Sequence, residues 1–306
     1  MIIDAHAHIW HEVHGRTGTG VTRSLRCGRI QLGDEEIQLL PPLANSTSFP
    51  PEILLANMDW AGVDKAVLLQ GSFYGENNAL VAEACQQWPD RFVGAGYVDP
   101  RDPNCRDEFK RCVEDYGFHL LKFEMSVSTG FVGIYPDLHL DGAEMAWIWE
   151  EAAHRNLVVT LDLGAVGAAS YQTDAVEAII TRYPTLRIVI AHLAQPAIGR
   201  HDATLDDLWQ SQILLARHPN VWFDISALPA NAGRTEDYPY PTACDYLRRA
   251  VALVGADKLM WGTDAPGLLS VATYPQLLSW VTRHCEFLSA EELKAISGET
   301  AGQLYF

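Results

Sequence analysis

The chain has 306 residues, of which 48% are hydrophobic, and its formal net charge at pH 7 is −17. A chain this acidic lacks the basic surplus that binds phosphates, so we exclude nucleic acids and anionic membrane surfaces as partners and expect a small-molecule substrate. No apolar stretch is long enough to span a bilayer, and no signal-peptide pattern precedes the first apolar run.

The first predicted strand, "MIIDAHAHIW", carries polar residues where a buried strand should be apolar. Asp4, His6 and His8 follow two isoleucines at a spacing of two. Because alternate side chains of a strand share a face, we expect these three groups to converge on one enclosed space. A lone histidine is more often a structural or surface group, but two neutral imidazoles on one face give zinc two nitrogen donors.

The segment from residue 11 to residue 50 fits neither helix nor strand periodicity. It is rich in Gly, Pro, Arg and Ser, and it is too long for an ordinary strand-to-helix connection. In a barrel it would leave the first strand at the end where active sites are built, so we expect a loop insertion that serves as a lid or substrate-binding loop. Arg23 and Arg26 within it are candidates to clamp a substrate carboxylate, with solvated loop charges as the alternative.

Seven further apolar runs predict strands. They are KAVLLQG from Lys65, FVGAGYVDP from Phe92, HLLKFEMS from His119, LVVTLDLG from Leu157, RIVIAHLA from Arg187, VWFDISAL from Val221 and LMWGTDAP from Leu259. Amphipathic segments with a period near 3.6 lie between them, and several end at Gly or Pro as helices do. This alternation predicts an α/β fold, a single (β/α)8 TIM barrel over residues 1–306. An open doubly wound sheet is the alternative, but no glycine-rich turn follows the first strand.

Polar residues break the apolar pattern near the C-terminal ends of several predicted strands. They are Lys122, Glu124, Asp162, His192, Asp224 and Asp264. Together with the first-strand histidines they predict a ring at one end of the barrel, which makes physical sense around a cation because buried charges need partners. Asp224 has a helix cap as its alternative role, and Lys122 and Glu124 have a mutual ion pair as theirs.

The six cysteines are scattered along the chain without a C-x-x-C pair. This spacing is typical of neither a zinc finger nor a redox motif. We expect reduced, mostly buried thiols and a cytoplasmic protein. The oligomeric state, a homo-oligomer included, stays open.

Three motifs carry a resemblance to a known family. "DAHAHIW" at the start, "IVIAHL" around His192 and "WGTDAP" around Asp264 resemble the amidohydrolase superfamily, in particular its amidohydrolase-related branch. That branch is similar to the aminocarboxymuconate and hydroxybenzoate decarboxylases and to small lactonases. The resemblance implies a distorted (β/α)8 barrel with a divalent metal, zinc or else manganese, held by His6, His8 and Asp264. It also implies that His192 is a metal ligand or a catalytic acid and base.

The chain departs from the family pattern at the end of the fifth predicted strand. The family usually has a histidine there, and this sequence has Asp162. A carboxylate could ligate the metal with a preference for harder ions, or it could orient a ligand imidazole by accepting its N–H. A two-metal site with a carboxylated Lys122 is a further alternative, less favoured without that histidine.

Three functions follow from the predicted ring. The first is metal-dependent hydrolysis of an amide, ester or lactone, with Asp264 moving the proton of a metal-activated water, His192 stabilising developing negative charge, and Lys122 and Glu124 contacting the substrate. The second is non-oxidative decarboxylation of an aromatic or muconate-type acid. The third is a non-catalytic binding protein, because fold alone does not fix function. We expect the hydrolase, with the decarboxylase next.

Overall fold

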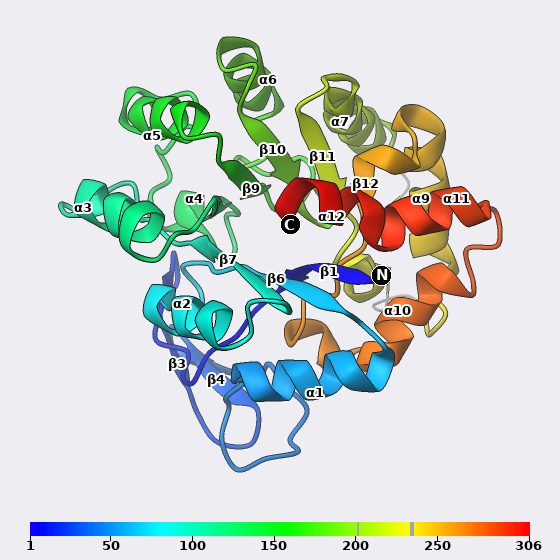
Figure 1. The fold of residues 1–306 in the computed structure, drawn as a ribbon, viewed down its shortest axis with the longest axis horizontal. Coiled ribbons are helices and arrows are strands. Elements are labelled where there is room, and N and C mark those ends of the chain that lie inside the picture. Colours follow the sequence, from blue (N-terminus) through cyan, green and yellow to red (C-terminus); the bar gives the residue numbers. More distant parts are fainter. Residues whose placement is uncertain (201, 233–235) are drawn as a thin grey trace.

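The computed structural model describes residues 1–200, 202–232 and 236–306. Eight parallel strands form one sheet in the order β1, β6, β7, β8, β9, β10, β11, β12. Their bounds are Ile3–Ala7, Lys65–Leu68, Phe92–Gly96, Leu120–Glu124, Val158–Asp162, Arg187–Ile190, Val221–Asp224 and Leu259–Met260. A parallel bridge between Ala7 and Ala265 joins the two ends of the sheet. The predicted (β/α)8 barrel is confirmed, with all eight strands in the predicted runs (Figure 1).

The strands are apolar because both of their faces are covered. Inward residues such as Leu120, Val158 and Val189 form one cluster inside the barrel, and the outward residues pack against the helices. Leu304 and Tyr305 of α12 (Thr300–Tyr305) join the inner cluster. This short helix therefore closes the end of the barrel opposite the polar ring, and it lies over the barrel centre in Figure 1.

Seven outer helices overlap the predicted amphipathic segments. They are α1 (Pro51–Ala61), α2 (Asn78–Gln87), α3 (Cys105–Lys110), α5 (Ala143–His154), α6 (Thr173–Arg182), α7 (Ala203–Ile213) and α9 (Pro241–Val254). The structure adds α4 (Phe131–Ile134), α8 (Leu228–Ala232), α10 (Tyr274–Thr282), α11 (Ala290–Lys294) and α12. No helix in the described ranges has the length and apolar character needed to cross a membrane.

The insertion is folded, whereas its composition predicted an irregular loop. It contains an antiparallel sheet of β2 (Arg16–Thr17), β3 (Gly20–Ser24), β4 (Arg29–Leu32) and β5 (Glu35–Gln38). Val13 and Ile30 are fully buried, as is Trp10 just before the insertion, so this segment shares the main hydrophobic core. In Figure 1 the sheet is seen at the side of the barrel where α1 and α2 lie.

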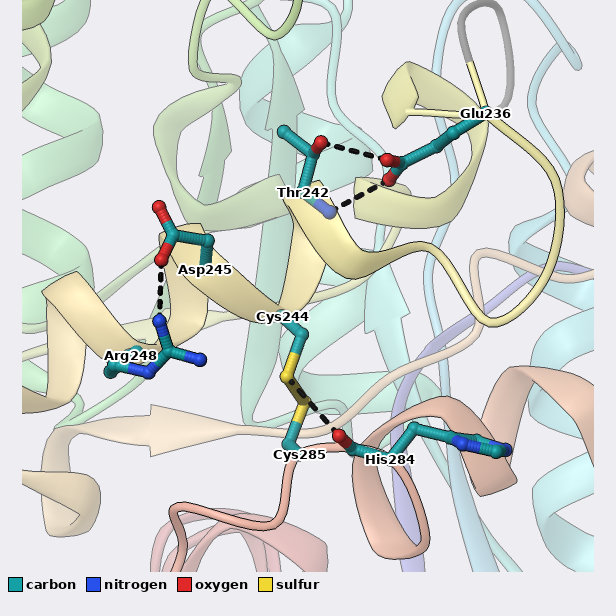
Figure 2. The surroundings of a disulfide bond; sticks show 7 residues. All are labelled: Glu236, Thr242, Cys244, Asp245, Arg248, His284 and Cys285. Carbon is teal, nitrogen blue, oxygen red and sulfur yellow. Dashed lines mark hydrogen bonds and ion pairs between the residues drawn. A yellow bond between two sulfur atoms is a disulfide. The ribbon is translucent and has the colours of Figure 1, made fainter.

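The prediction of six reduced, mostly buried cysteines is wrong. Cys244 on α9 and Cys285, just after α10, form a disulfide with a Cα–Cα distance of 5.6 Å (Figure 2). The remaining four are free thiols, and only Cys112 among them is buried. A sequence separation of 41 residues without a motif gave no sign of the pairing, which depends on how α9 and α10 are brought together by the barrel.

Candidate metal centre

His6 and His8 both lie at the C-terminal end of β1 with one ring nitrogen already in use. His6 Nδ1 donates to Asp224 Oδ2 at 3.0 Å, and His8 Nδ1 donates to the Leu69 carbonyl oxygen at 2.8 Å. Both side chains are almost completely buried. Because a carbonyl oxygen can only accept a hydrogen bond, Nδ1 of His8 must carry the proton. Nε2 of the neutral ring then has a free lone pair. Burial accordingly lowers the pKa of His8 to about 4, which keeps it neutral.

Asp264 completes a set of three converging donor atoms. Its Oδ1 lies 3.1 Å from His8 Nε2 and 3.8 Å from His6 Nε2. The backbone of Asp264 is left-handed, with φ 56°, and its N–H donates to the His6 carbonyl oxygen at 2.7 Å. This strained turn at the end of β12 is therefore held against β1, as functional turns often are.

The donor set fits a divalent cation. The three ligand atoms lie within 4.8 Å of one another. A lone pair on His8 Nε2 that faces a carboxylate oxygen at 3.1 Å is unfavourable unless a cation lies between the two acceptors. Two neutral imidazoles and one carboxylate are also ligands that zinc accepts. The residues that the sequence favoured as ligands thus come together in the structure.

Asp4 does not join this cluster, which corrects the prediction from strand periodicity. Its carboxylate accepts hydrogen bonds from Thr263 N and Oγ1 and from the Tyr274 hydroxyl of α10. The pairing of β1 with β6 shifts register between Asp4 and Ala7. A bulge of this kind breaks the two-residue alternation, so Asp4 faces the outer layer while His6 faces the barrel interior.

His192 forms a buried ion pair with Asp162. Nε2 of His192 donates to Asp162 Oδ2 at 3.0 Å, and Nδ1 donates to Ser226 Oγ at 2.8 Å, whose own hydroxyl donates to Asp224. Burial acts to lower the pKa of His192, but the charge and hydrogen bond of Asp162 outweigh it and raise the pKa to about 10. Burial likewise acts to raise the pKa of Asp162, yet the His192 charge holds that pKa well below its usual range.

This ion pair bears on the two roles considered for Asp162. Besides His192, its carboxylate accepts from Gly164 N at 2.9 Å. Neither of the two candidate metal-binding groups among the described residues contains Asp162. The geometry therefore favours Asp162 as the partner that orients and charges His192 over Asp162 as a ligand.

Asp224 occurs in the second candidate group, with His6 and His192. Its oxygens accept from His6 Nδ1, from His192 N at 3.0 Å and from Ser226 N at 3.1 Å. Burial acts to raise its pKa, but the electrostatic interaction and hydrogen bond with His6, the charge of His192 and the Ser226 hydroxyl outweigh it and lower the pKa to about 2. With its lone pairs already used, Asp224 fixes the His6 ring so that Nε2 faces the site.

Lys122 and Glu124 project from β8 into the same interior. Lys122 Nζ lies 3.3 Å from Glu124 Oε2 and 3.4 Å from His6 Nε2. Glu124 Oε1 accepts from Ser126 Oγ at 2.6 Å, and burial followed by the nearby charge of Asp162 raises the Glu124 pKa to about 7. The ion pair considered from the sequence is present, and it places a positive charge next to the predicted ligands.

Arg23 and Arg26 lie elsewhere. Arg23 donates to Gln31 Oε1 at 2.9 Å, and Arg26 Nε donates to Asn45 Oδ1 at 3.0 Å. Both side chains are exposed, and within the described ranges their hydrogen bonds stay inside the insertion. Their role as carboxylate clamps remains a prediction that no contact supports.

Two residues near the site escaped the sequence analysis. Ser226 links His192 to Asp224, and only its place two residues after Asp224 could have suggested it. Tyr74 lies with its ring 4.6 Å from that of His8. Burial, and then the charges of Asp264, Glu124 and Asp162, raise the pKa of the Tyr74 hydroxyl well above its usual range.

Residues 3–306 match the model of the amidohydrolase family. The chain belongs to this family. It is similar to an L-fucono-1,5-lactonase of Burkholderia ambifaria, with 28% identity across 99% of this chain and 94% of that protein. It is also similar to a gamma-resorcylate decarboxylase of Rhodococcus jostii, with 26% identity across 62% of this chain and 64% of that protein.

Solved structures share the fold. An amidohydrolase of Burkholderia multivorans with bound zinc superposes with a TM-score of 0.73 at 21% identity, across 100% of this chain and 99% of that chain. A probable 2-pyrone-4,6-dicarboxylic acid hydrolase of Acinetobacter baumannii gives a TM-score of 0.69 at 18% identity, across 99% and 98% of the two chains. The protein is thus an enzyme of the amidohydrolase family, and hydrolysis is the activity that its lactonase relatives support.

Proposed function

We propose that the protein is a metal-dependent hydrolase whose substrate is a small lactone. The observation that carries this proposal is the convergence of His6 Nε2, His8 Nε2 and Asp264 Oδ1 at the functional end of the barrel. The lactone, rather than an amide or another ester, is favoured by the similarity to the L-fucono-1,5-lactonase across nearly the whole chain. We propose zinc as the metal, with manganese as the alternative.

His6, His8 and Asp264 would hold the metal. A bound divalent ion polarises a carbonyl group and lowers the pKa of water toward about 7. Asp264 is 20% exposed at its side chain, and no described residue donates a hydrogen bond to its Oδ2. That oxygen is therefore available to accept a proton from the attacking water and to return it to the leaving oxygen.

The remaining charged groups shape the field around the reacting carbonyl. Both N–H groups of His192 are engaged by Ser226 and Asp162, so we assign it a fixed positive charge and not a proton transfer. The ammonium of Lys122 supplies a second positive charge next to His6. Fixed charges of this sign stabilise the negative oxygen that forms when water adds to the carbonyl.

Decarboxylation is the alternative, favoured by the similarity to the gamma-resorcylate decarboxylase. A substrate carboxylate would need a cation in a chain whose net charge is −17, and Lys122 is the buried candidate. A non-catalytic binding protein is not supported by any relative named above. A cytoplasmic location and the oligomeric state, including a homo-oligomer, stay predictions.

The experiment is a substrate screen with isotopic labels. The metal-loaded protein is incubated with a panel of six-membered aldonolactones, amides and hydroxybenzoates, once in ¹⁸O-water and once in deuterium oxide. We expect lactone opening with ¹⁸O in the product carboxylate and no carbon dioxide. Release of carbon dioxide with deuterium at the ring carbon would establish the decarboxylase instead. Turnover of no compound would contradict both.

A further inference from the structure

Tyr74 lies in a tight turn, residues 71–75, that follows β6 and borders the metal centre. The N–H groups of Tyr74 and Gly75 both donate to the Gly71 carbonyl oxygen, at 3.0 and 3.2 Å. At the start of the turn, a Cβ added to Gly71 would lie 3.3 Å from the Glu124 side chain. The turn is therefore packed directly against the charged groups of β8.

The Tyr74 ring packs against two other rings. Its centroid lies 4.7 Å from that of Trp10, at an interplanar angle of 17°, and 4.6 Å from that of His8, at an interplanar angle of 39°. Trp10 is fully buried, and its Nε1 donates to the Thr47 carbonyl oxygen, so it gives the stack a fixed wall. The ring of Tyr74 thus has one position next to a predicted metal ligand.

The hydroxyl at the end of this ring has no hydrogen-bond partner among the described residues. The hydroxyl oxygen is also not fully buried, so a bound molecule can reach it. A half-buried tyrosine normally directs its hydroxyl to a partner. An oriented but free O–H beside the metal centre is what a substrate-contacting donor requires.

The insertion holds the turn that carries Tyr74. Three consecutive carbonyl oxygens of the turn accept hydrogen bonds from it: Ser72 from Arg16 N at 2.8 Å, Phe73 from Thr22 Oγ1 at 2.6 Å, and Tyr74 from His14 N at 3.1 Å. The two backbones approach so closely at Gly15 that no side chain would fit there, since a Cβ added to Gly15 would lie 2.0 Å from the Ser72 carbonyl oxygen. The insertion is therefore docked on this turn and leaves it little freedom.

We propose that the Tyr74 hydroxyl contacts the substrate, donating a hydrogen bond to the carbonyl oxygen at which negative charge develops, and that the insertion is the element that positions Tyr74 for this role. The inference rests on the proposed lactone hydrolysis for the identity of that oxygen. Tyr74 is a neutral donor in a cluster rich in carboxylates, so it adds a hydrogen bond to the substrate without adding charge. Thr22 acts through Tyr74 and is a positioning residue.

Two variants with matched controls test the proposal. Tyr74→Phe keeps the stacked ring and removes only the hydroxyl, and its control is Tyr183→Phe, whose hydroxyl contacts the Ala146 carbonyl oxygen between two outer helices. Thr22→Val removes the hydrogen bond to Phe73, and its control is Thr17→Val, a buried threonine whose hydroxyl contacts only Thr19 and Gly20 of the insertion itself.

The readouts are kcat and KM for an aldonolactone, the dissociation constant of the corresponding lactam by calorimetry, metal content and melting temperature. Losing a donor to a developing oxyanion costs about 10² to 10³ in kcat, so we expect at least a tenfold loss of kcat for Tyr74→Phe. Thr22→Val should lose less kcat than Tyr74→Phe, and the two control variants should keep the wild-type kcat. The metal content and melting temperature of Tyr74→Phe and Thr22→Val should equal those of their control variants.

Each outcome decides the question. Tyr74→Phe with wild-type kcat and wild-type lactam affinity would overturn the proposal, as would a loss of activity that merely follows a loss of metal or of stability. If the wild type binds the lactam but opens no lactone, the proposed function fails, and the lactam affinities of Tyr74→Phe and its control still decide the role of Tyr74. A wild type that neither binds the lactam nor opens the lactone overturns both proposals.

Discussion

At the scale of single residues, most of the polar groups in the barrel are committed to one another, and Asp264 is the exception. Asp4, Asp162 and Asp224 each accept hydrogen bonds from at least two donors. Among the described residues, the only close contact of the Asp264 carboxylate joins Oδ1 to the unprotonated Nε2 of His8 and, at 3.8 Å, of His6, and Asp264 is the most exposed member of the candidate metal centre. A carboxylate with an unused oxygen at the mouth of the site is the best placed to transfer a proton.

We expect Asp264→Asn to abolish most of the turnover. The variant keeps the size of the side chain but removes the basic oxygen, and losing a positioned acid or base costs about 10² to 10⁴ in rate. The change should appear in kcat, with substrate affinity reduced less, when initial rates are measured with saturating metal. The control is Asp257→Asn, an exposed carboxylate in the turn before β12. Equal rates for both variants would exclude Asp264 from the chemistry.

Asp224 offers a separate test of how the ligands are oriented. Its two oxygens accept from His6 on one side and from His192 N and Ser226 on the other. In Asp224→Asn one oxygen is replaced by an NH2 group, which cannot accept a hydrogen bond from His6, His192 N or Ser226. The orientation of the His6 ring is therefore weakened. Loss of such a ligand-orienting partner costs about 10- to 100-fold in metal affinity. Competition with a chelator would measure this, and an unchanged affinity would show that His6 is held in another way.

At the scale of secondary structure, the sequence predicts what depends on local pattern and misses what depends on contacts. The eight strands were predictable because parallel strands covered on both faces read as short apolar runs. The bulge in β1 was not predictable, because it depends on which residues of β6 lie opposite Asp4 and Ala7. The insertion strands are two to five residues long and mostly exposed or half-exposed, so their apolar alternation is too weak to predict a sheet.

The same distinction applies to the candidate metal centre. The convergence of His6, His8 and Asp264 was predictable from spacing and position, since each comes at the C-terminal end of an apolar run, and their role as metal ligands stays a prediction. The pairing of His192 with Asp162 was not, because it depends on the left-handed turn that follows β10, in which His192 has φ 59°. Tyr74 was missed because the turn 71–75 carries no motif, and the position of its ring depends on contacts with His8, Trp10 and the docked insertion.

The disulfide joins two helical segments and should contribute to stability. Closing a loop of 41 residues removes chain entropy worth about 4 kcal/mol from the unfolded state, by the loop-closure relation. We expect Cys244→Ala with Cys285→Ala to lower the free energy of unfolding by up to about that amount. The matched control is Cys85→Ala with Cys105→Ala, two free thiols on outer helices. If reductant leaves the wild-type denaturation midpoint unchanged, the disulfide does not form in solution.

At the scale of the whole molecule, metal binding and folding should be coupled through the closure of the barrel. The predicted ligands come from β1 and from the turn after β12, the two strands whose junction closes the sheet. The unfolded chain has no formed site for a cation that is held by both ends of the sheet. The binding free energy of this cation therefore stabilises the native state. The opposite end of the barrel is closed by α12, whose apolar residues need no ligand.

We therefore expect about one divalent ion per chain and a metal-dependent melting temperature. A ligand at 100 times its dissociation constant stabilises the native state by about 2.7 kcal/mol, which for a chain of this size raises the melting temperature by several degrees. The His6→Ala, His8→Ala double variant should keep the fold, show no bound metal by elemental analysis and lose the response to added zinc. Replacing His119 and His284, which contact Tyr305 and Tyr238 away from the centre, provides the control. Stoichiometric metal retained by the double variant would place the ion elsewhere in the protein.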